Sequence, residues 1–583
     1  MGQQDSLNVA SPGLFDDFLK EVQVLDDFRA EYSKRYEFEG LGRQDQDVQR
    51  LIEAMAFYSA RTRRTAERAV EDYKRLALER LFPHLLSPMP EMALLFPVLG
   101  ANTQETRALP VGAPIALTPI DPGLASATKF FRTVEPLTVF PIHIVERSVK
   151  VQRQVGSTGI EQSATVRQEP KWTLQLEIAA SPSGPGKKRY YDDVQLPLTE
   201  LRLQLNPVGD LLLCLRAFDA LKESFTKVTC RFFSDGASRH EIERRSVRFG
   251  SPKETPAEGF DNPIESARRL IHFPLTDCCL SIDVSGAPSE WDLLRLEFEM
   301  NDQWPAGVAL GDSSFLLNAV AVENLQRCVA EPVEVNGERL RLPISHPEPS
   351  TGMSVREVHG VYVSDPGAAG ARKPLFPNLL IDGGYSLELH GSSRAASLRI
   401  SPSASAALEP QTVYIDCSWY QPAPLKEPAR VSTEASDLGA IRWVFATPTR
   451  EAQLSPVGQD IGALEQLLEL HGARELNAEN LRHLLHALGV GNSEAFGRVP
   501  RYLSTVTTEF VPDSQAALGG IRSYDLGFRK VPNVLIPAVR HLGSLLAPAL
   551  AAWTGESEIR VTVIFEEQPE LGNREFTWRV SDV

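Results

Sequence analysis

The chain has 583 residues, with 60 Lys and Arg against 76 Asp and Glu, so its formal net charge is −16. An apolar content of 42% and a charged content of 23% exclude wholesale disorder, and the length suggests about four structural units. The acidic balance argues against nucleic acid or an anionic membrane as the main partner, because neutralising phosphates requires clustered Lys and Arg.

The first 90 residues are predicted to form two long amphipathic helices. Apolar residues recur about every 3.5 positions in both, with charged residues between them. The first stripe consists of Phe15, Phe18, Val22, Leu25, Phe28, Tyr32 and Tyr36. The second consists of Val48, Leu51, Met55, Tyr58, Thr62, Ala66, Ala69, Tyr73 and Leu76. Gly40 and Gly42 separate the helices, and Pro83, Pro88 and Pro90 end the segment.

From about Leu94 to Ala330 the apolar period changes to two, which predicts half-buried antiparallel strands. The clearest alternation is that of Trp172, Leu174, Leu176 and Ile178. A second β-rich region runs from about Glu331 to Pro456, and Val413, Ile415, Cys417 and Trp419 alternate within it.

The last region is predicted to be mixed. A short helix lies around residues 461–471, Asn477 caps a second helix that stops at Gly489, and a terminal strand runs from Ile559 to Phe565. We therefore expect a multi-domain α+β fold in which long N-terminal helices precede mainly antiparallel β domains and a mixed α/β C-terminal domain. The expected divisions are a helical bundle segment at 1–92, a wing-like β-rich domain at 93–330, a second β-rich domain at 331–456 and the mixed domain at 457–583.

The motifs of several enzyme classes fail on specific residues. G-x-S-x-G does not occur, and the Gly186-Lys187 pair lacks the first Gly and the final Ser or Thr of a P-loop. His240-Glu241 begins like a zincin motif, but Arg244 stands where the second zinc ligand belongs. No G-x-G-x-x-G follows a strand and opens a helix. We expect no enzymatic activity, no catalytic residues and no cofactor.

Two groups of residues are weaker candidates for binding sites. His483 and His486 lie three residues apart on a predicted helix with Glu479, but no Cys or third His is near in sequence. Histidines at the surface or at the edge of the core are therefore the favoured interpretation, and no metal site is expected. The second helix carries several Arg residues interleaved with acids, which favours an ion-paired, solvated face over contact with an acidic partner. Those basic residues are Arg61, Arg63, Arg64, Arg68, Arg75 and Arg80.

Neither end of the chain shows a membrane signal. The N-terminal residues lack the basic and apolar regions of a signal peptide. The most apolar late stretch, Leu535 to Trp553, is interrupted by Pro537, Arg540, His541 and Pro548, so we expect no spanning helix there. The expected location is the cytoplasm.

The two N-terminal stripes have two interpretations, between which the sequence alone does not decide. They are either the ordinary core of a helical domain or a surface for another chain. Two helices alone bury little of apolar stripes this long, and large exposed apolar patches are rare on monomers. Either the rest of the chain or another chain must therefore cover them.

Several segments resemble the TssF family, whose members are baseplate proteins of bacterial type VI secretion systems. The first helix, 16–36, and the runs DVQRLIEAMAFYSAR and LERLFPHLLSPMPEM are similar to the family's N-terminus. In the same order follow LPVGAPIAL, KFFRTVEPLTVFPI, FLLNAVAVENL and REVHGVYV. The resemblance covers about the first 365 residues.

This resemblance implies a structural, non-enzymatic role. Two copies of such a protein join one TssG-like protein and a TssE-like sheath initiator in a wedge, and wedges bind TssK-like proteins and ring the spike hub. The helical part contributes to a bundle between chains, and the machine assembles in the cytoplasm before docking on an inner-membrane complex. The resemblance points to a protein interface made of Phe15, Phe18, Val22, Leu25, Phe28, Tyr32, Leu51, Met55 and Tyr58.

Two other functions remain open on the residues alone. A β-rich polysaccharide hydrolase would need two carboxylates roughly 5–10 Å apart in an aromatic cleft. A stand-alone ligand-binding module would be monomeric and stable without partners.

Overall fold

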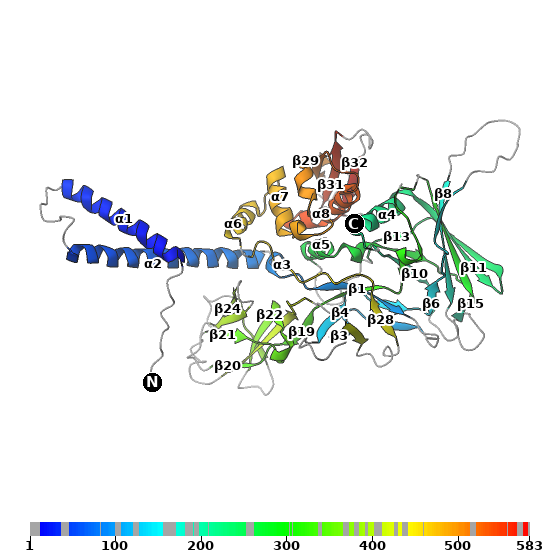
Figure 1. Cartoon of the computed structure of the whole chain (residues 1–583), viewed down its shortest axis with the longest axis horizontal. Coiled ribbons are helices and arrows are strands. Elements are labelled where there is room, and N and C mark those ends of the chain that lie inside the picture. Colours follow the sequence, from blue (N-terminus) through cyan, green and yellow to red (C-terminus); the bar gives the residue numbers. More distant parts are fainter. Residues whose placement is uncertain are drawn as a thin grey trace. The chain divides into compact units, whose positions relative to one another are not determined.

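The structure is a computed structural model with eight α-helices and thirty-two strands among the residues that it describes (Figure 1). Those residues are 12–35, 46–81, 83–98, 106–119, 128–154, 171–180, 190–191, 197–207, 209–251, 262–301, 304–305, 307–335, 341–364, 372–377, 384–390, 395–400, 411–424, 429–433, 441–458, 460–513, 520–556, 558–567 and 575–580. The chain divides into two compact units, Met1–Pro83 and His84–Val583.

The first unit is a pair of helices packed against each other, α1 (Pro12–Arg35) and α2 (Gln46–Leu81). Among the α2 residues whose burial is described, the buried apolar ones are Ile52, Ala56 and Ala60, which are four residues apart and therefore on one face of the helix. On α1, the stripe residues Phe18, Val22 and Leu25 are half-buried. Tyr36, the last residue of the predicted stripe, lies outside the described residues.

The second unit begins with a six-stranded antiparallel sheet in the order β27-β3-β4-β18-β1-β28. Its strands are β27 (Ala429–Thr433), β3 (Pro114–Pro119), β4 (Lys129–Thr133), β18 (Val320–Glu323), β1 (Met92–Val98) and β28 (Arg442–Phe445). Leu95, Phe131, Val322 and Trp443 are among the residues of its core. Because residues 429–445 pair with strands that precede residue 330, a boundary at that residue does not separate two sheets. The four-domain division stays a prediction.

Two further sheets follow. The strands of one are β12 (Ala237–Arg244), β11 (Phe225–Ser234), β16 (Leu293–Met300), β8 (Lys171–Ala180) and β6 (Ile142–Ile144), with β7 (Lys150–Gln154) also paired to β8. The other runs through β13 (Arg248–Phe249), β14 (Cys279–Asp283), β10 (Glu200–Leu205) and β17 (Phe315–Leu317). Small ladders join β2 (Arg107–Leu109) to β5 (Leu137–Val139) and β9 (Tyr190–Tyr191) to β15 (Glu290–Trp291). The helices of this region are α3 (Pro83–Leu86), α4 (Leu211–Ser224) and α5 (Pro263–His272).

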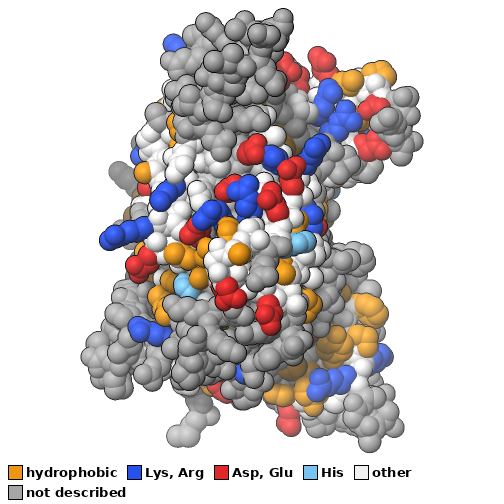
Figure 2. Space-filling model, turned by 90° about the vertical axis from the view of Figure 1, so that its right-hand side faces the viewer, with side chains coloured by type: hydrophobic (Ala, Val, Ile, Leu, Met, Phe, Trp, Pro, Cys, Tyr) orange, Lys and Arg blue, Asp and Glu red, His pale blue; other side chains and the backbone are white. Residues whose placement is uncertain are grey.

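One face of the sheet around β11 carries a ladder of ion pairs. Lys227 Nζ lies 2.9 Å from Glu243 and 3.1 Å from Glu299. Arg231 is bracketed in the same way by Glu241 and Glu297 on the neighbouring strands. Basic and acidic side chains are interspersed on the side of the molecule where β8 and β11 lie (Figure 2). Alternating charges of this kind keep a sheet face solvated.

The middle β region forms a sheet in the order β19-β26-β22-β23, with β20 also paired to β26. Its strands are β19 (Gln326–Val329), β26 (Gln411–Tyr420), β22 (Ser354–Ser364), β23 (Arg372–Pro374) and β20 (Val333–Val335). A three-stranded sheet of β21 (Arg341–Ile344), β25 (Ala395–Ile400) and β24 (Tyr385–His390) contributes to the same core. Ile415, Cys417 and Trp419 are buried in that core, as their alternation predicts.

The C-terminal region combines helices with a four-stranded sheet. The helices are α6 (Ile461–Leu470), α7 (Ala478–Ala487) and α8 (Ile536–Thr554), and the sheet runs β29 (Leu503–Pro512), β30 (Gly520–Arg529), β31 (Ile559–Glu566), β32 (Glu575–Arg579). The amide N–H of Asn480 donates to the Asn477 side chain at 2.8 Å, which confirms the predicted cap of α7. The parallel pair is β30 and β31, and α8 connects them.

These elements confirm the predicted α+β class, with long helices first, antiparallel sheets next and a mixed region last. The apolar stretch after Leu535 forms α8, in spite of Pro548 inside it. Within the described part of the chain, no helix has both the length and the apolar character that a membrane span requires.

Candidate protein-interaction site

The two-helix unit exposes an unusual number of large apolar side chains. Eleven of the seventeen exposed large hydrophobic residues found among the described residues lie on α1 and α2. They are Phe15, Leu19, Val24, Phe28, Tyr32, Leu51, Met55, Phe57, Tyr58, Val70 and Tyr73. Monomeric proteins rarely expose so much apolar surface in one place, so this unit is the strongest candidate for an interaction surface.

Small and polar residues occupy the contact between the two helices. Ala56 and Ala60 are fully buried on α2 and allow a close approach of the backbones. Glu21 of α1 is also buried, and its carboxylate accepts a hydrogen bond of 3.0 Å from Ser59 and lies 2.6 Å from an Arg63 nitrogen. Most of the large apolar side chains therefore remain exposed and are not buried by the contact between α1 and α2.

The nine residues predicted for a protein interface fall into two groups. Phe18, Val22 and Leu25 are half-buried on α1. The other six are exposed: Phe15 58%, Phe28 64%, Tyr32 41%, Leu51 61%, Met55 54% and Tyr58 74%. The α2 stripe read from the sequence is thus not the face that packs within the unit. Residues 52, 56 and 60 form that face. The sequence pattern did not indicate it, because two of these residues are alanines, which contribute little to an apolar stripe.

A second site lies in the other unit, around the strap, by which we mean residues 84–91. Its backbone carbonyls accept hydrogen bonds from charged side chains of distant segments. Arg268 of α5 donates to Ser87 O at 2.9 Å, and Arg356 of β22 donates to Pro88 O at 3.1 Å. His272 Nε2 lies 3.1 Å from Pro90 O. Proline has no backbone N–H, so a proline-rich segment cannot pair regularly with a neighbouring strand. Its backbone carbonyls are instead satisfied by donors on side chains.

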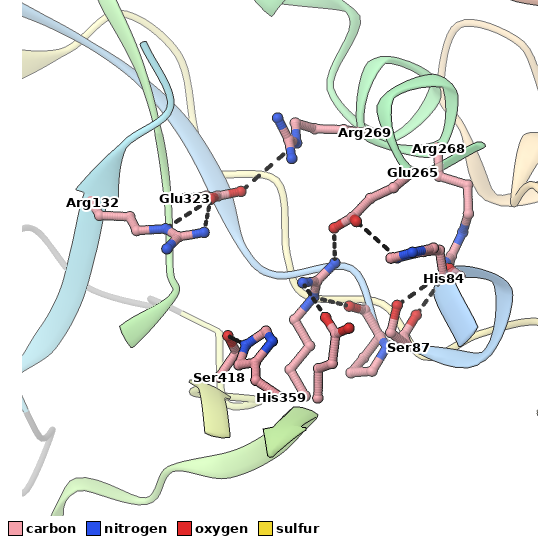
Figure 3. A network of polar contacts seen from close by, with 12 residues as sticks. His84, Ser87, Arg132, Glu265, Arg268, Arg269, Glu323, His359 and Ser418 are labelled. Carbon is pink, nitrogen blue, oxygen red and sulfur yellow. Dashed lines mark hydrogen bonds and ion pairs between the residues drawn. The ribbon is translucent and has the colours of Figure 1, made fainter. Parts of the chain in front are cut away.

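The charges of this network meet at Glu265, as Figure 3 shows. Its carboxylate lies 2.6 Å from an Arg356 nitrogen and 2.9 Å from His84 Nδ1. Burial by itself would raise the pKa of Glu265, but the hydrogen bond from His84 and the Arg356 guanidinium outweigh it and hold that pKa well below its usual range. Burial, together with the Arg356 charge, lowers the pKa of Arg268 to about 9.

Glu323 forms a second centre beside the first. Arg132 of β4 lies 2.8 Å and Arg269 of α5 lies 3.9 Å from its carboxylate. Lys129 pairs with the fully buried Glu91 at the end of the strap. The network joins α5 to strands of two sheets through buried ion pairs.

None of the contacts in this network is predicted by the sequence. Bonded partners in this network lie up to 268 positions apart and follow no spacing rule; the proline-rich run of the strap is the one local signal, because prolines leave backbone carbonyls that need other donors. His483 and His486 lie on α7, half-buried and exposed respectively. Across the described ranges, no three His, Cys, Asp or Glu residues are grouped so that they could hold a metal ion.

Comparison with known proteins identifies the family. The model of the family described as "Type VI secretion system, TssF" matches residues 26–382, which is more than half of the chain. The chain belongs to the TssF family. The match extends from α1 past β23, so it includes most of the helical unit, the strap and its network.

Two solved structures share the fold of this TssF-family protein. One is a chain from the type VI secretion TssK-TssF-TssG baseplate subcomplex seen by cryo-electron microscopy, with a TM-score of 0.68, 16% identity and coverage of 91% of this chain and 98% of that one. The other, from the baseplate complex of the type VI secretion system, has a TM-score of 0.53, 15% identity and coverage of 94% and 97%. The search among curated proteins finds no match.

Proposed function

We propose that this TssF-family protein is a structural component of a type VI secretion baseplate, and that it uses the exposed apolar surface of α1 and α2 to join other chains. Family membership and a fold shared over nearly the whole chain with baseplate proteins support the role. The apolar residues that the two helices leave exposed are the observation that supports the surface.

The proposed partners begin with the proteins named with the similar solved structure. TssK-like and TssG-like proteins come first, because the TssK-TssF-TssG subcomplex contains a chain of this fold. A second copy of this chain, a TssE-like protein and the spike hub complete the proposed wedge. The protein works in the cytoplasm, where it reaches the membrane only through a membrane complex, and it is not an enzyme.

The interface comprises the residues predicted from the sequence, with Met55 and Tyr58 near its centre. These two side chains are 54% and 74% exposed, so each has much apolar area to bury. Full burial of such a side chain contributes about 1.5–3 kcal/mol. An aspartate at residue 55 would forfeit that contribution and bury an unpaired carboxylate as well.

The test is co-expression of tagged TssG-family and TssK-family proteins with Met55→Asp, followed by pull-down and circular dichroism. Because about 1.4 kcal/mol is tenfold in affinity, we expect at least about tenfold weaker capture. The helical signal should stay at the wild-type level, since the Met55 side chain is 54% exposed.

Two matched variants separate assembly from folding. Glu53 is exposed and lies about 160° around the helix from Met55, so the charge change Glu53→Lys should leave capture unchanged. Ala56 is fully buried, so Ala56→Asp should reduce helical content. Normal capture of the Met55→Asp variant would show that the stripe is not a shared interface, and loss of its helical signal would show that it belongs to an internal core.

A further inference from the structure

Two cysteines face each other across the middle β sheet. β19 pairs with β26 in the antiparallel sense, and Cys328 is the direct partner of Cys417. Directly opposed residues of an antiparallel pair project from the same face of the sheet. Both side chains accordingly belong to one core, in which Cys417 is fully buried and Cys328 is partly exposed at the edge.

The backbone geometry of this pair suits a cross-link. Two residues farther along the same register, the Ala330 N–H donates to Ile415 O at 2.8 Å, which makes Cys328 and Cys417 a hydrogen-bonded pair. The Cα atoms of such pairs lie about 5.5 Å apart, within the range of about 4.4–6.8 Å that a disulfide spans. The Cβ atoms of hydrogen-bonded pairs lie toward the upper end of about 4.5–5.5 Å, at least about 1 Å beyond the mean of a relaxed disulfide, so the strands must shift to form the bond, and it would be strained and readily reduced.

A histidine lies beside the exposed member of the pair. His346 Nε2 is 3.4 Å from Cys328 Sγ. His346 Nδ1 lies 3.1 Å from the backbone nitrogen of Glu348, 3.2 Å from its carbonyl oxygen and 3.4 Å from the Thr351 hydroxyl. We assign the proton to Nε2, because the Glu348 N–H can only donate and is the shortest of the three contacts. The ring therefore offers an N–H to the sulfur, and Trp419, 5.0 Å away in an edge-on contact, holds the ring in place.

We propose that Cys328 and Cys417 form a reversible redox site that a peroxide converts into a cross-strand disulfide. The Cys328 thiolate attacks one peroxide oxygen, the O–O bond breaks, and a sulfenic acid forms while the other oxygen leaves as water after taking up a proton. The Cys417 sulfur then attacks the Cys328 sulfur, the S–O bond breaks, and a second water leaves with the Cys417 proton. Two electrons pass from the thiols to the peroxide.

The cross-link would fasten a junction between two sheets. β19 follows β18 of the first sheet after two residues, and Gln421 follows β26 directly. Gln421 accepts a 3.0 Å hydrogen bond from Asn324 through its side chain and donates its backbone N–H to the same residue at 2.6 Å. A covalent bond between β19 and β26 would therefore hold the segments that already meet at Asn324.

The chain contains its own comparison pair. Cys214 and Cys278 are close enough that a hydrogen bond donated by the Cys278 thiol to Cys214, with burial, raises the pKa of Cys278, but both are buried. Burial raises the pKa of Cys328 as well, and the negative charges of Asp416 and Glu348 raise it further. Its thiolate fraction should consequently grow about tenfold per pH unit below that pKa, and the rate of oxidation with it.

The experiment treats the full-length protein with hydrogen peroxide, blocks remaining thiols with an alkylating reagent and maps peptides by mass spectrometry without reduction. We expect a linked Cys328–Cys417 peptide at least about tenfold more abundant than a Cys214–Cys278 peptide, formed faster at higher pH and lost on adding a dithiol. Cys417→Ala should stop at a sulfenic acid on Cys328 that dimedone traps, and Cys328→Ser should protect Cys417.

Three results would overturn the proposal. One is oxidation of Cys328 to the sulfinic acid in the wild-type protein without any linked peptide. Another is a Cys214–Cys278 link that forms as fast as the Cys328–Cys417 link. The third is unchanged reactivity of Cys328 in His346→Gln with retained strand signal, because the histidine would then have no part in the site.

Discussion

Replacement of Arg356 by methionine tests whether the strap network stabilises the second unit. The Arg356 side chain is only 6% exposed and serves both the Glu265 carboxylate and the Pro88 carbonyl. Methionine is of similar length and apolar, so the variant removes the charge and the donors while filling most of the space. It leaves Glu265 mostly buried, with His84 at 2.9 Å.

Removing one partner of a buried ion pair costs about 3–5 kcal/mol, because the other charge stays desolvated. Since His84 remains beside Glu265, the lower end of that range is expected, about 3 kcal/mol. With a urea dependence of about 3 kcal/mol per M for a large unit, the unfolding midpoint should fall by about 1 M.

The effect should depend on pH in a definite direction. The pKa of Glu265 is held low in the folded protein, so its ion pair stabilises the fold above the unfolded pKa of about 4.3 and loses that contribution as pH falls. Without Arg356 the pKa of Glu265 rises toward its usual range, and less stability remains to be lost in acid. The difference between wild type and Arg356→Met should therefore shrink from pH 6 toward pH 3.

The assay is urea unfolding followed by circular dichroism of the strands at several pH values. The matched control is Arg327→Met, which removes an Arg that is 48% exposed and paired with Asp416. Exposed pairs contribute about 0–1 kcal/mol, so the control should move the midpoint little. Equal midpoints for Arg356→Met and wild type at pH 7, or a difference that widens in acid, would refute the stabilising role of the pair.

Two further changes probe the same unit. Burial lowers the pKa of His272 to about 4, so the wild-type protein should lose up to about 3 kcal/mol of stability as pH falls from 6.5 toward 4, and His272→Gln should flatten that part of a pH–stability curve. An unchanged curve would contradict this. A Cβ at Gly543 of α8 would come within 2.5 Å of the Trp578 ring, so Gly543→Ala should lower the unfolding free energy by about 1–3 kcal/mol, although alanine favours helices. Chemical denaturation followed by tryptophan fluorescence measures this free energy. A gain in stability would show that the Trp578 ring can move away from the new methyl group without cost.

The sequence alone was sufficient for features that depend on local periodicity. Stripes with a period near 3.5 predicted the long helices, and alternation predicted strands such as the one containing Leu174 and Leu176, because burial on one face imposes those periods. The cap at Asn477 followed from the chemistry of one residue. The ordered family segments indicated the TssF fold, which the comparisons confirm.

Only the tertiary structure decided which faces meet and which charges lie together. A helix pattern marks large apolar residues, but Ala56 and Ala60 form the contact with α1 because small side chains permit close packing, and Met55 and Tyr58 stay exposed. Glu265 and Arg356 are 91 residues apart, and no spacing rule joins them. Their pairing, like that of Cys328 with Cys417, depends on strand register and on how the fold brings distant segments together. Burial of long-range contacts determines both, and the local sequence does not encode them.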